Sequence, residues 1–186
     1  EILDGTPVYC GVFNNFKMLF IDRSTYGNNF EPKEGVGYAR KIAVDTSLSI
    51  ILQNNNYYRS LVFCVDCDVT VPSDYFTRAF DLFKDNHSAG VYNFIHHALP
   101  DQSLNTKESV RYYDLFLKYY SSGLKWADST YAFTTIGSTI VTSIWAYILI
   151  RGFSKHLLAG EDFYFLNKAA KVGEILELSG RPINIQ

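Results

Sequence analysis

The stretch "SLVFCVDCDVTVPSDYF", from Ser60 to Phe76, decides the fold predicted for this chain. Its first seven residues form a near-continuous apolar run, which is typical of a strand buried on both faces of a sheet. Pro72 and the Ser-Asp pair that follows it are signals for the start of a helix. The stretch therefore predicts a strand, a turn that carries two aspartates, and a helix, in the order expected of an α/β protein.

The rest of the chain continues this alternation. Runs of β-branched and aromatic residues predict strands at residues 6–13, 17–22, 88–97 and 174–178, and an extended segment at 131–142. Apolar residues at helical spacing predict helices at residues 38–53, 72–85, 108–123 and 160–173. Strands alternating with helices indicate an α/β fold with an open, mostly parallel sheet flanked by helices. Ligands of such sheets bind beyond the carboxyl ends of the strands, where Asp22 and Asp66 both fall.

Length and composition limit the class of protein. The 186 residues suit one domain that covers residues 1–186, and a chain that is 47% hydrophobic and 19% charged has the composition of a folded domain. The net charge of −2 supplies no positive field for a nucleic-acid backbone, so we expect no nucleic-acid partner. The longest apolar stretch, residues 140–150, is about half as long as a membrane-spanning helix and is predicted to lie in the core.

Other features bear on the cellular setting. The three cysteines, Cys10, Cys64 and Cys67, do not predict a disulfide framework and favour a reducing, cytoplasmic compartment. The acidic Glu1 and Asp4 stand where a signal peptide would carry a basic segment. Because the chain starts without a methionine, we expect it to be a fragment of a longer protein.

The two aspartates of the opening stretch have two interpretations. Asp66 and Asp68 could hold a hard divalent cation, since Mg²⁺ binds through one or two carboxylates together with substrate phosphates. They could equally belong to a turn at the end of the strand, where aspartate is common. Cys64 and Cys67 have the spacing of a redox motif, but Cys64 lies inside the apolar run and is predicted to be buried and inert.

A second acidic pair opens the helix predicted at residues 160–173. Glu161 and Asp162 suit the first turn of a helix because of its dipole, and the same dipole would keep a carboxylate ionised and ready to accept a proton. Two weaker signals accompany this pair. The glycine loop "GVGYARK" (Gly35–Lys41) carries Arg40 and could serve a phosphate. His96 and His97 end a strand, so at most one of them would face a site, as a metal ligand or as a structural hydrogen-bonding group.

Four segments in this order resemble the family 2 glycosyltransferases of the GT-A fold, over about residues 17–178. They are "FIDRS", "GVGYARKIAVD", "VFCVDCDVTVPSDYF" and "GEDFYFL". The pair "TIGSTIV" and "AGEDFYFL" is similar to a bacterial subgroup of these enzymes. The chain departs from the family pattern in "IDRST", which has one aspartate where two are common.

The resemblance implies an inverting transferase that uses a nucleotide-diphosphate-sugar donor and Mn²⁺ or Mg²⁺. Asp22 matches the position that contacts the nucleotide base, and Arg40 matches the arginine near the donor. Asp66 and Asp68 match the D-x-D motif, Asp68 as the direct metal ligand and Asp66 nearer the ribose or the metal, with His96 or His97 as a further candidate ligand. Asp162 matches the catalytic base, with Glu161 beside it.

The resemblance leaves the acceptor open between a glycan, a lipid-linked molecule and a small molecule, and it suggests peripheral association with the inner face of a membrane. Aromatic residues between Tyr112 and Tyr131, including Trp126, could line the acceptor site, but core packing is expected for most of them. Two alternatives are a nucleotidyltransferase that acts on sugar phosphates and a non-catalytic GT-A-like binding domain. The chain lacks the glycine-rich, basic N-terminal signature of the former, and its intact acidic pairs disfavour the latter.

Overall fold

The computed structural model describes residues 6–53, 57–155 and 159–186. The chain forms two compact units. The first unit comprises Glu1–Ser60 and Gly152–Glu161, and the second comprises Leu61–Arg151 and Asp162–Gln186.

The first unit begins with a β-hairpin. Strands β1 (Val8–Phe13) and β2 (Phe16–Ile21) lie where the apolar runs at residues 6–13 and 17–22 predict strands. They pair antiparallel in a two-stranded sheet of their own, which the prediction of one mostly parallel sheet did not include. Asn14 and Asn15 form the turn between them with φ angles of 45° and 69°. Asparagine tolerates this left-handed conformation, and two such residues in a row give the turn that matches the twist of a hairpin.

Helix α1 (Val36–Ile51) follows a loop in the first unit and confirms the helix predicted at residues 38–53. It buries Tyr38, Ile42 and Val44, and a short 3₁₀ helix, η2 (Tyr57–Arg59), lies later in the same unit. Of the apolar residues at helical spacing Ile42 is buried, whereas Ala43 and Leu52 are exposed, so the period predicts the helix correctly but not its buried side.

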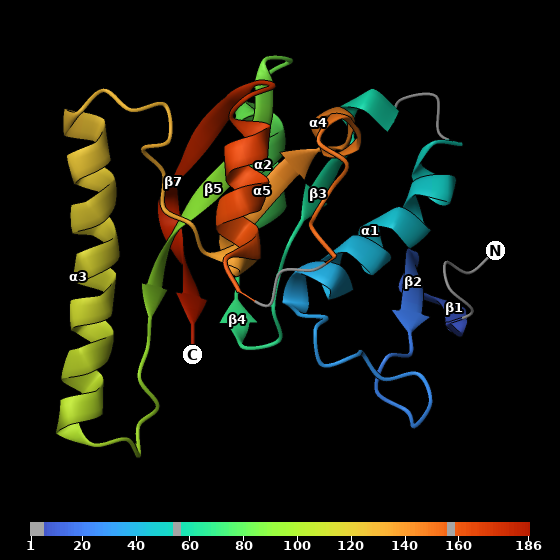
Figure 1. The fold of residues 1–186 in the computed structure, drawn as a ribbon, viewed down its shortest axis with the longest axis horizontal. Helices are drawn as coiled ribbons and strands as arrows, with labels where there is room; N and C mark the ends of the chain where they lie inside the picture. The colour runs from blue at the N-terminus through green and yellow to red at the C-terminus, as the bar shows by residue number, and fades with distance from the viewer. Residues whose placement is uncertain (1–5, 54–56, 156–158) are drawn as a thin grey trace. The chain divides into compact units, whose positions relative to one another are not determined.

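The second unit is built on a five-stranded sheet flanked by helices (Figure 1). Its strands lie in the order β3 (Leu61–Phe63), β6 (Ile140–Ser143), β5 (His87–His96), β7 (Glu174–Ile185) and β4 (Val69–Thr70). The prediction of a mixed α/β fold is confirmed.

The prediction of a mostly parallel sheet is wrong. Within the described sheet β5 and β7 pair parallel, whereas β3 with β6, β6 with β5, and β4 with β7 all pair antiparallel. The units β3–α2–β5 and β5–α3 do follow the predicted alternation, but β6 is inserted between β3 and β5 in the opposite direction. A buried strand has the same apolar sequence in either direction, so the pattern alone could not distinguish the two.

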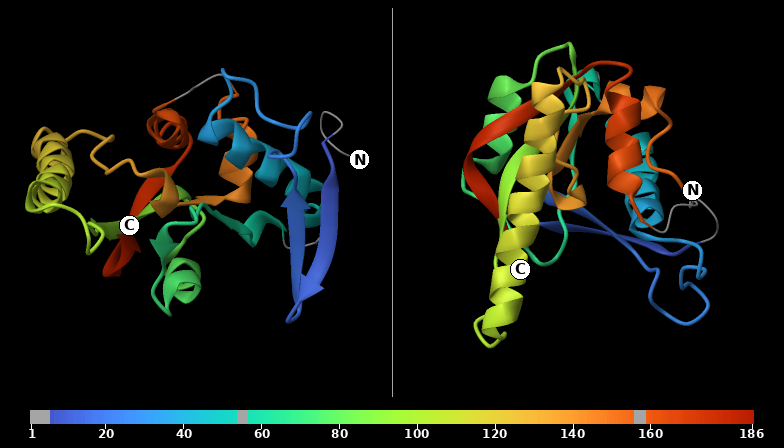
Figure 2. Two further views of the ribbon diagram at one scale, coloured as in Figure 1. Left: turned by 90° about the horizontal axis from the view of Figure 1, so that it is seen from below. Right: turned by 60° about the vertical axis from the view of Figure 1, so that its left-hand side comes forward.

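Helices α2 (Tyr75–Leu82) and α5 (Glu161–Ala169) cover opposite faces of this sheet (Figures 1 and 2). Helix α3 (Leu104–Trp126) is longer at both ends than the helix predicted at residues 108–123. The remaining elements are η3 (Gly137–Thr139) and α4 (Ile144–Leu149), which lie before and after β6.

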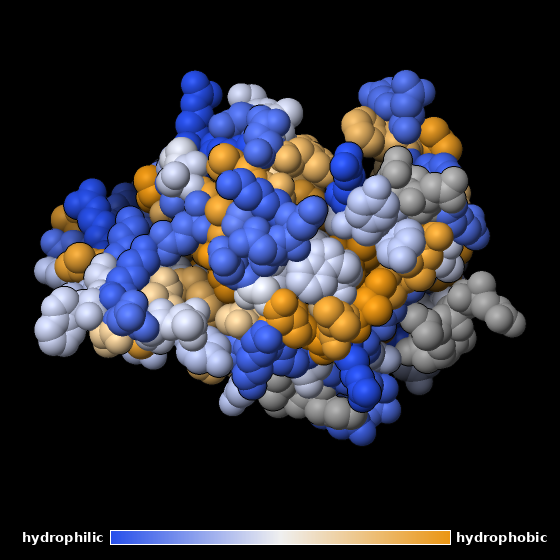
Figure 3. Space-filling model, turned by 90° about the horizontal axis from the view of Figure 1, so that it is seen from above, coloured by the Kyte–Doolittle hydropathy of each residue, from blue (hydrophilic) through white to orange (hydrophobic). Residues whose placement is uncertain are grey.

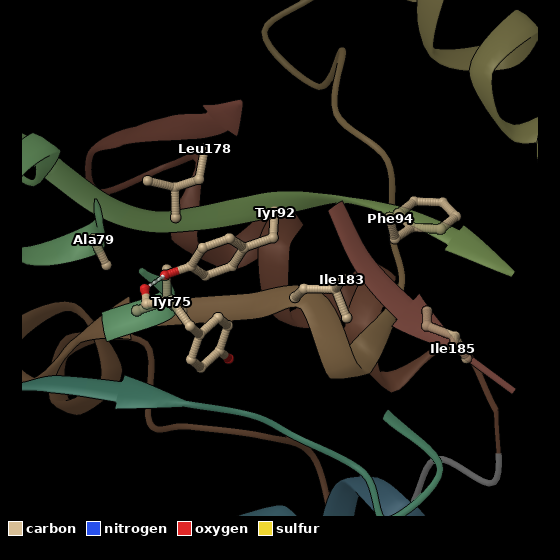
Figure 4. Packing of buried hydrophobic residues seen from close by; sticks show 8 residues of the cluster. Tyr75, Ala79, Tyr92, Phe94, Leu178, Ile183 and Ile185 are labelled. Carbon is tan, nitrogen blue, oxygen red and sulfur yellow. Dashed lines mark hydrogen bonds between the residues drawn. The ribbon is translucent and has the colours of Figure 1, made fainter. Parts of the chain in front are cut away.

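The core of the second unit forms between α2 and the sheet (Figure 4). The rings of Tyr75 and Tyr92 stack with centroids 4.6 Å apart, and the Tyr92 hydroxyl donates a hydrogen bond to the Tyr75 carbonyl oxygen. Burial raises the pKa of Tyr92 to about 12. The apolar stretch at residues 140–150 contributes Ile140, Val141 and Ile144 to buried positions, as predicted.

The aromatic residues of α3 do not pack in the core, which corrects the expectation for most of them. Within α3, all of which is described, Asp114 is the one buried residue. Its aromatic side chains are largely exposed, among them Tyr112, Phe116, Tyr119 and, at 91%, Trp126. A helix packed by one side against a sheet has room to bury only that side, and α3 carries aromatic residues around the rest of its circumference. Pale and orange side chains accordingly reach the surface between blue ones (Figure 3).

In the part of the chain that the structure describes, no helix is long and apolar enough to cross a membrane.

Candidate functional site

One end of the sheet in the second unit gathers several of the predicted site residues. Because β6 is antiparallel to both β3 and β5, and β7 is parallel to β5, the strands β3, β5 and β7 all run in one direction. Ile185, near the end of β7, pairs with His96 of β5 on one side and with Val69 of β4 on the other. The backbones of Val69 and His96 are therefore two strand spacings, about 10 Å, apart.

The segment between β3 and β4 carries the D-x-D aspartates to this end of the sheet. It leaves β3 with a hydrogen bond from the Cys64 amide to the Ile140 carbonyl oxygen, and the Asp68 carbonyl oxygen accepts one from the Gln186 amide at 3.1 Å. Asp66 and Asp68 are both exposed, with a turn closed by the Val69 amide on the Asp66 carbonyl oxygen at 3.3 Å. The strand-end position predicted for these aspartates is confirmed, and it coincides with the place where parallel strands end.

The donor chemistry of this segment fits Mn²⁺ or Mg²⁺. Two exposed carboxylates supply hard oxygen ligands, and these ions commonly take their remaining ligands from water and substrate phosphates. No group of three or more His, Cys, Asp or Glu side chains that could hold a metal occurs among residues 6–53, 57–155 and 159–186. Asp66 and Asp68 would therefore hold the ion together with a ligand's own oxygens. Cys64 is buried, as predicted, and Cys67 is exposed.

The two histidines at the end of β5 differ in their surroundings. The ring nitrogen Nδ1 of His96 lies 2.5 Å from Oδ1 of Asp114, and the His96 amide donates to Oδ2 of the same carboxylate at 3.0 Å. The exposed His97 ring has Nε2 2.8 Å from Oδ1 of Asn184. Asp114 of α3 thus fixes the His96 ring, as carboxylates fix the rings of metal-binding and catalytic histidines. Sequence reasoning missed Asp114, since its only signal is an acid on an aromatic helix.

Asp22, in the first unit, organises its own loop. Its Oδ1 accepts hydrogen bonds from the amides of Ser24 and Thr25 at 3.1 and 3.0 Å, and its Oδ2 accepts one from the Asn28 side chain at 3.3 Å. The hydrogen bonds from Thr25, followed by that from the Ser24 amide, hold the pKa of the Asp22 carboxyl well below its usual range. Asp22 is 8% exposed, so most of its hydrogen-bonding capacity serves the turn that follows β2.

Arg40 and Glu161 form an ion pair in the first unit. Arg40 Nη1 lies 2.7 Å from Glu161 Oε1, and the two side chains are 10% and 14% exposed. Gly37, one turn before Arg40 on α1, lies directly beneath the Glu161 side chain. A Cβ atom at Gly37 would be 2.7 Å from the Cβ of Glu161. Gly37 and Arg40 of "GVGYAR" therefore both contact Glu161, the first by packing and the second by the ion pair. Residues three apart lie on the same side of a helix, which explains their spacing.

Asp162 follows Glu161 at the start of α5 and belongs to the second unit. Its Oδ1 accepts a hydrogen bond from the Phe163 amide at 2.7 Å. The positive end of the helix dipole favours a negative charge at this position. Its role as a base stays a prediction.

The first unit contains a second group of ion pairs, around Glu34, that the sequence did not predict. Glu34, with its side chain 5% exposed, lies between Arg23 Nη2 at 3.3 Å and Lys155 Nζ at 3.5 Å. Lys155 Nζ also lies 4.7 Å above the ring of Tyr38. The Tyr38 hydroxyl and then the Glu34 carboxylate raise the pKa of the Lys155 ammonium group. No local pattern connects residues so far apart in the sequence, so only the folded chain reveals this network.

The predicted site residues thus fall into two groups. Asp66, Asp68, the two histidines and Asp162 belong to the second unit, and Asp22, Arg40 and Glu161 belong to the first. Asp68 and His96 lie at the same end of one sheet, and Arg40 forms an ion pair with Glu161. In comparisons with known proteins, no protein-family model, no curated protein and no solved structure matches the chain.

Proposed function

We propose that the protein is a metal-dependent, inverting glycosyltransferase of the family 2, GT-A type, which moves a sugar from a nucleotide-diphosphate-sugar to an acceptor hydroxyl. The observation that supports this most is the exposed pair Asp66 and Asp68, which reaches the end of the sheet where β5 and β7 finish. Ligands of open α/β sheets bind at such ends, and paired carboxylates suit the cation that accompanies a diphosphate.

In this proposal Asp68 is the direct ligand of Mn²⁺ or Mg²⁺, and Asp66 holds the metal or the ribose. When bound, the ion neutralises the negative charge that develops on the departing nucleoside diphosphate. His96, fixed by Asp114, is the better candidate of the two histidines for a further ligand, because its ring orientation is set by a buried carboxylate. His97 is exposed and already engages Asn184.

Asp162 acts as the general base in this proposal. It takes the proton from the acceptor hydroxyl while that oxygen forms a bond to the anomeric carbon of the donor sugar, and the bond from that carbon to the diphosphate oxygen breaks. Attack from the side opposite the leaving group inverts the anomeric configuration. An aspartate at the first turn of α5 suits the role because a general base of this type must be a carboxylate that can accept a proton, and the helix dipole favours that negative charge.

The residues of the first unit serve binding and positioning in this proposal. Asp22 contacts the nucleotide base with what remains of its hydrogen-bonding capacity, and Arg40 contributes positive charge near the donor. Glu161 supports catalysis indirectly, because its carboxylate is committed to Arg40. The acceptor is a glycan, a lipid-linked molecule or a small molecule. A cytoplasmic location at the inner face of a membrane fits the exposed aromatic residues of α3.

The test is a binding screen followed by a turnover assay. Thermal stability is measured with UDP, GDP and dTDP, each with and without Mn²⁺, and sugar transfer is then measured with the sugar conjugates of any nucleotide that binds. Asp162→Asn is expected to keep nucleotide binding and lose transfer by at least a hundredfold, a typical contribution of a general base. Asp81→Asn, which changes an exposed aspartate on α2, is the matched control. Full transfer activity in Asp162→Asn would refute the base assignment.

The same experiment separates the alternatives. Nucleotide binding without transfer in the unaltered protein would indicate a non-catalytic binding domain. Formation of a nucleotide-sugar from a nucleoside triphosphate and a sugar phosphate would indicate a nucleotidyltransferase. Absence of any nucleotide-dependent stabilisation, with or without Mn²⁺, would contradict the proposal as a whole.

A further inference from the structure

The β1–β2 hairpin of the first unit has one side that is entirely uncharged. Its two strands lie side by side (Figure 2), and directly opposite residues of an antiparallel pair point to the same side. Six residues, paired across the strands, therefore share one side: Tyr9 with Phe20, Gly11 with Met18, and Phe13 with Phe16. We call these six residues the hairpin face.

Every side chain of the hairpin face is more than half exposed, from 54% for Met18 to 71% for Phe16. The other side of the hairpin differs, because Val8, Leu19 and Ile21 are half-buried there. Single exposed apolar residues are ordinary on a protein surface, whereas a contiguous apolar patch marks an interaction site. The hairpin face is such a patch.

The area of the hairpin face is sufficient for a specific interface. A buried aromatic side chain contributes about 150–250 Å², so the exposed parts of four rings and one methionine present roughly 600 Å². Two such faces in contact would bury about 1,200 Å² in total, which exceeds the roughly 1,000 Å² expected of a specific protein interface.

We propose that the hairpin face binds the same face of a second copy of this chain, so that two hairpins pack face to face in a symmetric dimer. A symmetric interface brings the same patch of both copies together, so a charge on the patch would meet a like charge. The hairpin face has no charge and avoids this repulsion.

The centre of the hairpin face is complementary to itself. With the two-fold axis parallel to the strands and between them, Met18 of each copy lies over Gly11 of the other. A Cβ atom at Gly11 would meet nothing within 4 Å in the single chain, so this position leaves room for a side chain of the second copy. Methionine is flexible and suits such a gap.

Other partners fit the hairpin less well. Surfaces that lie on lipid carry lysine or arginine for the headgroups, and the one charged residue between Val8 and Ile21, Lys17, lies on the other side of the hairpin. Within the described part of the chain β1 and β2 pair only with each other, so lipid would leave their outer backbone groups without partners. An extended peptide added to an outer edge would leave the hairpin face exposed.

The experiment is sedimentation velocity of the full chain over a range of protein concentrations. The unaltered protein is expected to sediment with the mass of two chains. Met18→Glu should sediment as one chain, because symmetry would place two unpaired carboxylates in an apolar interface. Gly11→Glu tests the interface from β1, where the single chain has open space for the new side chain. Circular dichroism confirms that each variant is folded.

Val12→Glu is the matched control, since it places the same charge at a 76% exposed position on the other side of the hairpin. Leu115→Glu makes the change on the exposed surface of α3. Both variants should remain dimeric. The proposed dimer does not depend on the proposed transferase activity, so the nucleotide screen and this experiment succeed or fail separately.

Three results would overturn the proposal. The unaltered protein sediments as one chain at every concentration, or Met18→Glu or Gly11→Glu remains dimeric, or either control dissociates the dimer equally. Flotation with vesicles of phosphatidylcholine and phosphatidylglycerol tests the membrane as the alternative partner. A protein that sediments as one chain and binds these vesicles until Met18→Glu abolishes the binding would assign the hairpin face to a membrane.

Discussion

Asp22 directly follows strand β2, and Asp68 ends the turn between β3 and β4, and the structure surrounds the two aspartates very differently. The Asp22 carboxylate accepts hydrogen bonds from Ser24, Thr25 and Asn28 and is 8% exposed. The Asp68 side chain is exposed, while its carbonyl oxygen accepts the Gln186 amide. A strand-end aspartate is therefore no ligand site in itself. Hydrogen-bond donors in the surrounding loop decide the role of such an aspartate. Where they bind the carboxylate it stabilises the loop, and where they do not it remains at the surface, within reach of a ligand.

The same contrast extends to the other acids of the two units. In the first unit Glu34 and Glu161 are largely buried and engage cations of the chain, so their charges hold the fold together. In the second unit Asp66 and Asp68 lie at the surface at one end of a sheet. Substitutions in the first group are therefore expected to lower the free energy of unfolding, and substitutions in the second to weaken ligand binding with little effect on stability.

The largest loss of stability is expected for Arg40→Ala. Removing the guanidinium leaves the Glu161 carboxylate, 14% exposed, without its ion partner, and such a change typically costs about 3 kcal/mol. Lys41→Ala is the control on the same helix, because Lys41 pairs with Asp45 in a more exposed salt bridge that contributes about 0.5 kcal/mol. Urea unfolding measures both. Equal losses in the two variants would show that the Arg40–Glu161 pair is no anchor of the first unit.

A smaller loss is expected for Gly37→Ala. The new Cβ would lie 2.7 Å from the Cβ of Glu161, and relieving that overlap should cost about 1–2 kcal/mol in the free energy of unfolding. Gly123→Ala provides the matched control, since Gly123 is also helical and a Cβ there would meet nothing within 4 Å. It should instead stabilise the protein by about 0.5–1 kcal/mol. The two substitutions should change the free energy of unfolding in opposite directions. Stabilisation by both alanines would mean that the Glu161 side chain does not pack against Gly37 of α1.

The pH dependence of the stability of Asp22→Asn tests whether the hydrogen-bonded Asp22 carboxylate stabilises the folded protein. Because the folded state lowers the pKa of Asp22, its carboxylate stabilises the protein fully above the usual aspartate pKa of about 4, and this contribution is lost as the pH falls below that value. The variant should melt at a lower temperature than the unaltered protein at pH 7, and the gap should narrow towards pH 3. If the difference in melting temperature stays constant with pH, the destabilisation comes from the changed shape of the side chain and not from the loss of its charge.

Sequence reasoning succeeded where the signal was local. The helix at α1, the strand at β3 and the position of Asp66 after that strand all follow from periodicity and apolar character within a few residues. The prediction that β3 is buried on both faces is wrong, because its three residues are half-buried and β3 is the first strand in the sheet order. Sequence reasoning failed where long-range pairing decides the outcome. The direction of β6 depends on which strands it enters between, and the partners Asp114 and Glu161 lie 18 and 121 residues from His96 and Arg40. The exposed aromatic residues of α3 were misjudged for a related reason, since composition does not show how much of a helix the rest of the chain can cover.

Asp68→Asn is expected to have the smallest effect on stability and the sharpest effect on binding. An exposed side chain away from the core changes the free energy of unfolding by no more than about 0.5 kcal/mol, so the melting temperature should stay within error of the unaltered protein. Any stabilisation by UDP, GDP or dTDP that requires Mn²⁺ should disappear, because the neutral amide lacks the negative charge with which a carboxylate holds Mn²⁺. Measured beside Asp22→Asn in one thermal-shift series, the two variants should show opposite behaviour. Asp22→Asn should lower the baseline melting temperature, and any shift that a nucleotide still causes in this variant should still require Mn²⁺. If Asp68→Asn destabilises the protein as Asp22→Asn does, both aspartates are structural and the metal site lies elsewhere.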